Sequence, residues 1–143
     1  MKKLLLLLAF FGITQFTQAP RQGIKGQVFW ISGDQMPGPG KTVSPQQGIV
    51  REVLAYERVT VKDVDQKGQF IQEITAEPAG KAMSKTDGSF KIKLPPGEYS
   101  LFTREPQGLF VNTVDHNGCI NCVVVKPKQY SWLTITIDYD AAY

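Results

Sequence analysis

The chain has 143 residues, of which 20% are charged, and its formal net charge is +3. A chain of this length fits one domain with a core of useful size. Its charges are scattered and nearly balanced, which excludes the electrostatic footprint of a protein that binds nucleic acid.

The first 19 residues have the pattern of a secretory signal peptide. A basic start, MKK, precedes an apolar run from Leu4 to Ile13. The run is too short to span a bilayer as a helix, which needs about 20 residues. Thr17 and Ala19 then supply the small residues of a cleavage site, so we predict removal of residues 1–19. A membrane anchor that stays attached is the alternative.

Residues 20–143 are predicted to form a single domain that is secreted or periplasmic, at the cell envelope. No second long apolar segment follows the leader, so we expect no membrane span after cleavage. Cysteines in such a compartment are more often oxidised than free, which bears on the two cysteines of this chain.

Short β-rich runs separated by Gly, Pro, Asn and Asp predict an all-β protein. The first strand is expected at 23–32, where Ile24, Val28 and Trp30 share one face. A Gly/Pro-rich loop follows at 33–48.

Further strands are expected at 49–61 and 70–76. The clearest hairpin signal is Asp87-Gly88, because both residues tolerate the positive φ of a tight turn. After this turn the apolar residues Phe90, Ile92 and Leu94 alternate with Ser89, Lys91 and Lys93. That alternation predicts one buried and one wet face.

The C-terminal half is expected to add three strands. Pro96-Gly97 predicts a turn that returns Tyr99 and Leu101 to the core. The last two strands are expected at 122–125 and 130–139. In the last one, three aliphatic residues alternate with Trp132 and two threonines. About seven strands are therefore predicted.

Three segments resemble carboxypeptidase regulatory-like domains. The stretches TDGSF (86–90) and LPPGEYSL (94–101) are similar to the T-D-G-x-F…L-P-x-G-x-Y core of that family, and IKGQV (24–28) to its first strand. The resemblance covers about residues 24–139. It implies an antiparallel Greek-key β-sandwich of about seven strands, of the transthyretin-like or prealbumin-like type. The loop at 33–48 is longer than in the family.

The resemblance implies a non-enzymatic role, because such domains usually serve as accessory or binding modules. Hydroxyisourate hydrolases share the transthyretin-like fold but need several histidines, whereas His116 is the only one here. We therefore expect no catalytic residues and no cofactor. Surface adhesins of similar fold can join a lysine and an acid by an isopeptide bond. Lys25 and Asp138 are candidates, although such pairs are commonplace.

Both cysteines lie in the segment CINC, residues 119–122, three residues after His116. In an extended strand their Cα atoms would be about 10 Å apart, too far for a disulfide. A turn at Asn121 would bring them together, and we favour this local disulfide. The alternatives are a zinc or copper site of His116, Cys119 and Cys122, with Asp115 as a fourth ligand, and two unpaired thiols. Thioredoxin-like chemistry is disfavoured because no helix follows Cys122.

The expected role is binding or structural support, with an envelope protein or a carbohydrate as partner. The loop 33–48 and the segment 108–122 are the candidate ligand-binding loops. Trp30, Tyr130 and Trp132 would form a stacking platform for sugars if their rings were exposed. Packing within the sandwich is the favoured interpretation of these rings, because Trp and Tyr in strands are more often buried or half-buried.

Overall fold

The computed structural model describes residues 21–43 and 45–143, so the expected signal peptide at 1–19 lies outside the described residues. In the described part the chain forms strands and no helix, and hence no helix that could cross a membrane. The strands are β1 (Gly23–Asp34), β2 (Gln47–Gly48), β3 (Glu52–Glu57), β4 (Gln66–Lys67), β5 (Phe70–Ile71), β6 (Gly80–Met83), β7 (Ser89–Lys93), β8 (Gly97–Glu105), β9 (Gly108–Phe110), β10 (Cys122–Val125) and β11 (Tyr130–Ala142).

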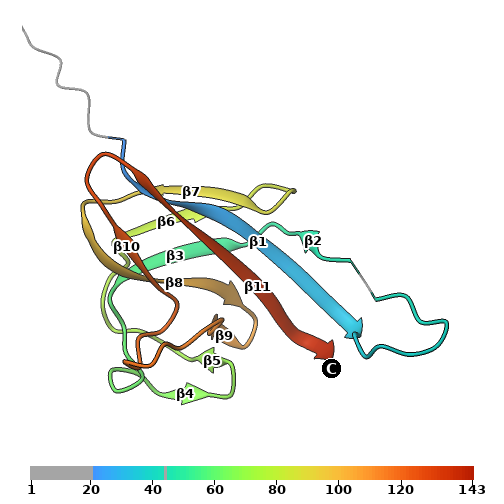
Figure 1. Ribbon diagram of the computed structural model, residues 1–143. Helices are drawn as coiled ribbons and strands as arrows, with labels where there is room; N and C mark the ends of the chain where they lie inside the picture. Colours follow the sequence, from blue (N-terminus) through green and yellow to red (C-terminus); the bar gives the residue numbers. More distant parts are fainter. Residues whose placement is uncertain (1–20, 44) are drawn as a thin grey trace, which may run out of the picture.

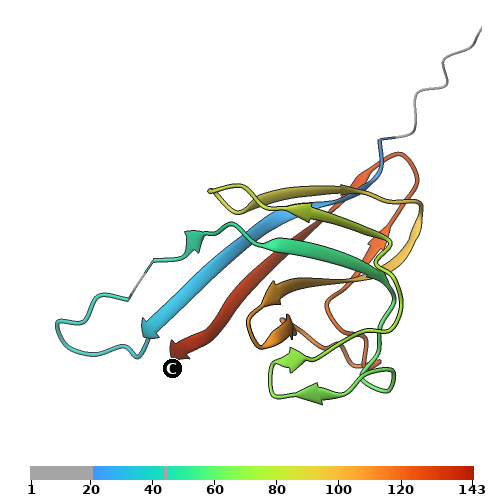
Figure 2. The same cartoon turned by 180° about the vertical axis from the view of Figure 1, so that it is seen from behind.

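The strands form two sheets that pack face to face (Figures 1 and 2). In the four-stranded sheet, β1 has β11 on one side and both β7 and β2 on the other. The seven-stranded sheet has the order β4-β5-β9-β8-β3-β6, and β10 also pairs with β8. The prediction of an all-β sandwich is therefore confirmed.

The first and last strands run parallel, whereas the expectation was an antiparallel sandwich. β1 and β11 stay in register from Gly23↔Tyr130 to Trp30↔Ile137, and a bulge shifts the register before Ser32. Parallel pairing is possible because the rest of the chain connects the two strands, so no hairpin imposes their direction. The two strands continue past the sandwich as a projecting arm (Figure 1).

The strand count also differs from the expected seven. The strands expected at 49–61 and 70–76 are shorter in the structure, where β3 ends at Glu57 and β5 has two residues. The short strands β2, β4, β6 and β9 were not predicted. Their ladders of two to four residues carry too few alternating side chains to produce a periodic signal.

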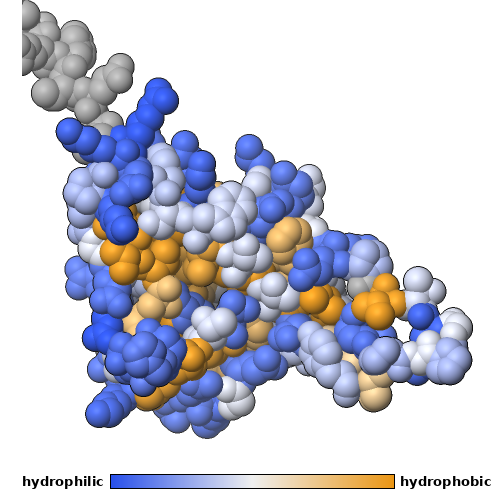
Figure 3. Space-filling view, viewed as in Figure 1, coloured by the Kyte–Doolittle hydropathy of each residue, from blue (hydrophilic) through white to orange (hydrophobic). Residues whose placement is uncertain are grey.

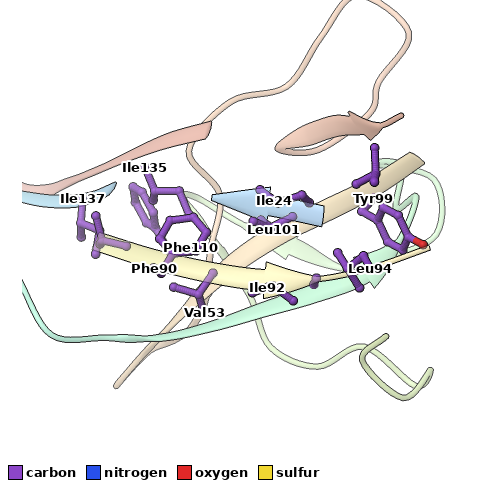
Figure 4. Packing of buried hydrophobic residues seen from close by; sticks show 13 residues of the cluster. Ile24, Val53, Phe90, Ile92, Leu94, Tyr99, Leu101, Phe110, Ile135 and Ile137 are labelled. Carbon is purple, nitrogen blue, oxygen red and sulfur yellow. The ribbon is translucent and has the colours of Figure 1, made fainter. Parts of the chain in front are cut away.

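The main core lies between the sheets and follows the predicted period-two pattern. Phe90, Ile92 and Leu94 are at most 6% exposed, and Ile135 and Ile137 of β11 are equally buried. Figure 4 shows side chains of both layers, including those of β7 and β8, meeting in one space. Burial of each such aliphatic side chain contributes about 1.5–3 kcal/mol.

A second apolar cluster covers the other face of the seven-stranded sheet. Leu54 and Phe102 point away from the main core and pack with Ile71, Val59 and Ile120. β3 and β8 are therefore buried on both faces, a feature that was not predicted from the sequence. The segments after β3 and after β9 supply the covering side chains.

Asn121 holds this second layer in place. Its side-chain Oδ1 accepts hydrogen bonds from the backbone N–H groups of Asn112 (2.8 Å) and Thr113 (2.7 Å). Its Nδ2 donates to the carbonyls of Leu101 (2.7 Å) and Phe110 (3.1 Å). The residue is 2% exposed and has a φ of 47°. Its side-chain amide supplies the hydrogen-bond partners that these four backbone groups do not find in a strand ladder.

We predict that Asn121→Ala lowers the free energy of unfolding by about 3 kcal/mol, because two buried and two part-buried hydrogen bonds to the backbone are lost and alanine is strained at positive φ. Urea denaturation would measure this loss of stability, provided that the m-value stays the same in the variant. The exposed Asn117 provides the control, since Asn117→Ala should change stability by less than about 0.5 kcal/mol. Equal effects of the two variants would contradict this role.

Candidate functional site

The cysteine segment forms a disulfide-closed turn. Cys119 and Cys122 are joined by a disulfide, with their Cα atoms 5.8 Å apart. The left-handed backbone of Asn121 supplies the turn that the extended chain could not. Cys119 is 1% exposed, and its N–H donates to Oδ1 of Asp115 at 2.9 Å.

The structure does not bring His116 to the sulfur atoms. The third possible ligand within 4.8 Å of both Sγ atoms is a carboxylate oxygen of Glu98, on β8. His116 lies on the exposed bend before Cys119. Asp115 binds the backbone of this bend: hydrogen bonds from the N–H of Cys119, and then from the N–H of Asn117, hold its pKa below the usual range. Metal binding needs thiolates, which the disulfide does not provide.

We predict that replacing both cysteines by serine lowers the free energy of unfolding by about 2 kcal/mol, since the short closed loop no longer restricts the unfolded chain. Wild-type protein in reductant should show the same loss in urea denaturation. Zinc added to the reduced protein should not restore the stability. Full recovery with zinc would contradict the disulfide account and favour the metal site of His116, Cys119 and Cys122.

The two candidate loops lie at different ends of the molecule. The loop 33–48 leaves the tip of the arm and returns through β2 (Figures 1 and 2). The segment 108–122 begins with β9, ends at the start of β10 and lies at the other end of the molecule. Much of the second segment is buried, including Leu109, Phe110 and Ile120. They therefore do not form one shared ligand surface.

The candidate lysine–acid pair for an isopeptide bond, which the sequence did not favour, is far apart in the pairing of β1 with β11. Lys25 lies opposite Trp132, and Asp138 is six residues further along β11. At about 3.3 Å per residue this distance is about 20 Å along the strand. No covalent bond can join these two side chains.

The three aromatic residues do not form one platform. Trp30 faces the interior, where its ring meets that of Tyr139 edge-on at 5.1 Å. Trp132 points to the opposite side of the sheet and is 57% exposed. Tyr130 is two residues before Trp132, so its side chain is on the same outer side. The platform is therefore Tyr130 and Trp132 alone.

Trp30 belongs instead to a buried charged group at the base of the arm. The Glu105 side chain is fully buried and pairs with Nε of Arg51 at 3.0 Å. The Tyr139 hydroxyl donates to Glu105, and the Arg51 guanidinium lies 5.7 Å from the Trp30 ring. Burial, and then the bond to Glu105, raise the pKa of Tyr139. Both Arg51 and Tyr139 bond the buried Glu105 carboxylate, so the role of the group is to fix the arm on the sandwich.

The outer side of the four-stranded sheet presents an ordered array of polar and aromatic side chains. Strand pairing places outward residues of β7, β1 and β11 in three rows across the sheet. We call this array the lysine–tryptophan face. Its rows are Lys93–Gly23–Tyr130, Lys91–Lys25–Trp132 and Ser89–Gln27–Thr134.

The lysines of this face gather around the aromatic residues. The Nζ atoms of Lys91 and Lys25 lie 4.5 Å and 6.0 Å from the centroid of the Tyr130 ring. The Trp132 indole N–H donates to the Thr134 hydroxyl at 3.0 Å, which orients the exposed ring. A pocket of about 550 Å³ lies beside this face. Lys25, Lys85, Lys91 and Trp132 line it, together with Ala82 and Met83 of β6 in the other sheet.

No carboxylate lines this pocket among the described residues. Asp87, at the turn before β7, is the acid beside the face, and its Oδ1 accepts hydrogen bonds from the N–H and hydroxyl of Ser89. The hydrogen bond from the Ser89 hydroxyl, and then the bond from its N–H, hold the pKa of Asp87 below its usual range. The pocket therefore combines positive charge with an exposed aromatic ring.

The edge of the four-stranded sheet is less open than its face. β11 has β1 on one side only, so its other side is a sheet edge. At Thr136 the N–H of this edge donates to Oδ1 of Asn112 at 3.2 Å. The Asn112 side chain therefore blocks the middle of the open edge of β11, which disfavours addition of a partner strand there.

Two other surface features are less suited to a ligand. A pocket of about 410 Å³ beside β3 has four acidic side chains, Glu57, Asp63, Glu73 and Glu77. Figure 3 shows apolar surface over β10 and the neighbouring part of β11, where Val124 is 52% exposed. Neither combines an oriented aromatic ring with an array of charges.

Comparison with protein-family models, with curated proteins and with solved structures found no match. The resemblance to carboxypeptidase regulatory-like domains therefore depends on the sequence motifs at 24–28, 86–90 and 94–101 alone. In the structure these motifs form the start of β1, the turn into β7, and the turn that leads from β7 into β8 of the other sheet. The candidate site is on two of the same strands.

Sequence reasoning identified Trp132 and Tyr130 but not the lysines beside them. The alternation on each strand places Lys91 and Trp132 on wet faces. Their alignment with Lys25 depends on which strands pair and in which register, and local sequence patterns do not carry that information.

Proposed function

We propose that this chain is a non-enzymatic β-sandwich module of the carboxypeptidase regulatory-like type, secreted or periplasmic, that binds a carbohydrate at the cell envelope. The bound chain lies on the lysine–tryptophan face. One observation carries the proposal: Trp132 is 57% exposed and hydrogen-bonded in place on the outer face of the sheet, with Tyr130 beside it.

The chemistry of the face suits a sugar. One side of a sugar ring presents C–H groups that stack on the negative face of an aromatic ring, and its hydroxyls need polar partners. Trp132 offers the stacking surface, and Gln27, Ser89 and Thr134 form the adjacent polar row. An open sheet face leaves room for an extended polymer.

A protein partner fits this face less well. The cores of protein–protein interfaces are depleted of lysine and need a well-packed apolar centre. Here Lys25, Lys91 and Lys93 occupy three of the nine positions, and Trp132 is the only large apolar side chain that is mostly exposed. The envelope location is supported by the leader sequence and by the disulfide, which persists in oxidising compartments.

We predict that Trp132→Ala weakens binding to a soluble polysaccharide by about tenfold, because the stacking surface is lost. Affinity electrophoresis against a panel of neutral and acidic polysaccharides would measure it. Tyr143 is a matched control, since it is an exposed aromatic residue outside the face, and Tyr143→Ala should bind like wild type. Retention of full binding by Trp132→Ala, or no binding of wild type to any polymer, would overturn the proposal.

A further inference from the structure

We infer that the ligand of the lysine–tryptophan face is an acidic polysaccharide, an extended sugar polymer with carboxylate groups. This inference deepens the proposed function and rests on it. It assigns the stacking contact to Trp132 and the recognition of charge to Lys25 and Lys91.

The first argument is the arrangement of like charges. Lys25 and Lys91 lie directly opposite each other on neighbouring antiparallel strands. Like charges in this position destabilise a sheet. Both Nζ atoms also lie within 6.0 Å of one tyrosine ring, so they are held in the same small region. An anionic group bound between them would relieve the repulsion.

The second argument is the contrast with the rest of the molecule. On the seven-stranded sheet, Arg58 pairs with Glu98 at 3.4 Å and Arg104 with Glu52 at 2.8 Å. Within residues 21–43 and 45–143, no ion pair involves a lysine of the lysine–tryptophan face. Glutamates therefore offset exposed arginines of the seven-stranded sheet, whereas no acid in the described part of the chain offsets the lysines beside the exposed tryptophan.

The third argument is geometric. Lys91, Lys25 and Trp132 form one row, and adjacent strands are about 4.8 Å apart. A sugar ring stacked on Trp132 therefore has its substituents within reach of Lys25, while Lys91 and Lys85 reach a neighbouring unit along the pocket.

The test compares polygalacturonate with the same polymer after full methyl esterification, which removes the charge and keeps the sugar backbone. Alginate and hyaluronate serve as further acidic probes. We expect tighter binding to the acidic polymers, weakened several-fold between about 50 and 500 mM salt because the charges are exposed. Equal binding of acid and ester at both salt concentrations would overturn the inference while the Trp132 result still stands.

Lys91→Glu separates loss of binding from loss of folding. The new carboxylate faces Lys25 and converts a repulsive pair into an attractive one, so the melting temperature should stay equal or rise. Binding to polygalacturonate should fall at least tenfold. Lys67→Glu makes the same charge change at an exposed lysine of β4 and should bind like wild type. Equal losses in the two variants would overturn the assignment of charge recognition to this face.

Two other polyanions complete the experiment. Single-stranded poly(dT) and vesicles with an anionic lipid also offer negative charge, and nucleic-acid bases can stack on tryptophan. We expect both to bind more weakly than the acidic polysaccharides. Tighter binding of either probe than of all three acidic polysaccharides would overturn the inference in favour of that polyanion.

Discussion

The position of β1 between β7 and β11 is the constraint on which the rest of the structure depends. Backbone pairing on both sides of Gly23–Gln27 determines which side chains point in and which point out. A Cβ atom at Gly26 would lie 1.7 Å from the Leu133 carbonyl oxygen, so only glycine permits this approach of β1 to β11. Ile24 and Val28 then enter the core, while Lys25 and Gln27 remain on the surface.

The two sheets have different tasks. The seven-stranded sheet is covered on its second side by the cluster around Phe102, and Asn121 and the disulfide hold that cover in place. Its exposed arginines are paired with glutamates. The four-stranded sheet keeps an open outer side with unbalanced lysines and an oriented tryptophan. This asymmetry is the physical reason for placing ligand binding on the four-stranded sheet.

Much of the fold could be predicted from period-two alternation, since Phe90, Ile92 and Ile135 are buried as expected. The second cluster was missed, although the consecutive apolar residues 53–56 are typical of a strand buried on both faces. The grouping of Trp30 with Trp132 was wrong. Trp30 shares a face with Val28, and Trp132 alternates with buried residues, so their opposite orientations could be predicted once both faces were assigned.

The parallel pairing and the row of Lys91, Lys25 and Trp132 could not be predicted. Both depend on contacts between segments more than 60 residues apart, and register is set by the packing of the whole sandwich. The buried roles of Glu105 and Asn121 depend in the same way on distant partners, Arg51 and Leu101. Single-strand patterns contain no signal for such pairs.

The measurement that tests this account most directly is oxidative cross-linking between cysteines placed on β1 and β11, mapped by mass spectrometry. Gln27 and Thr134 are direct partners in the parallel register, so cysteines at these positions should form a disulfide. Cysteines at Gln27 and Thr136 are one diagonal step out of register and should not. Efficient cross-linking of the second pair, or none of the first, would contradict the register that builds the lysine–tryptophan face.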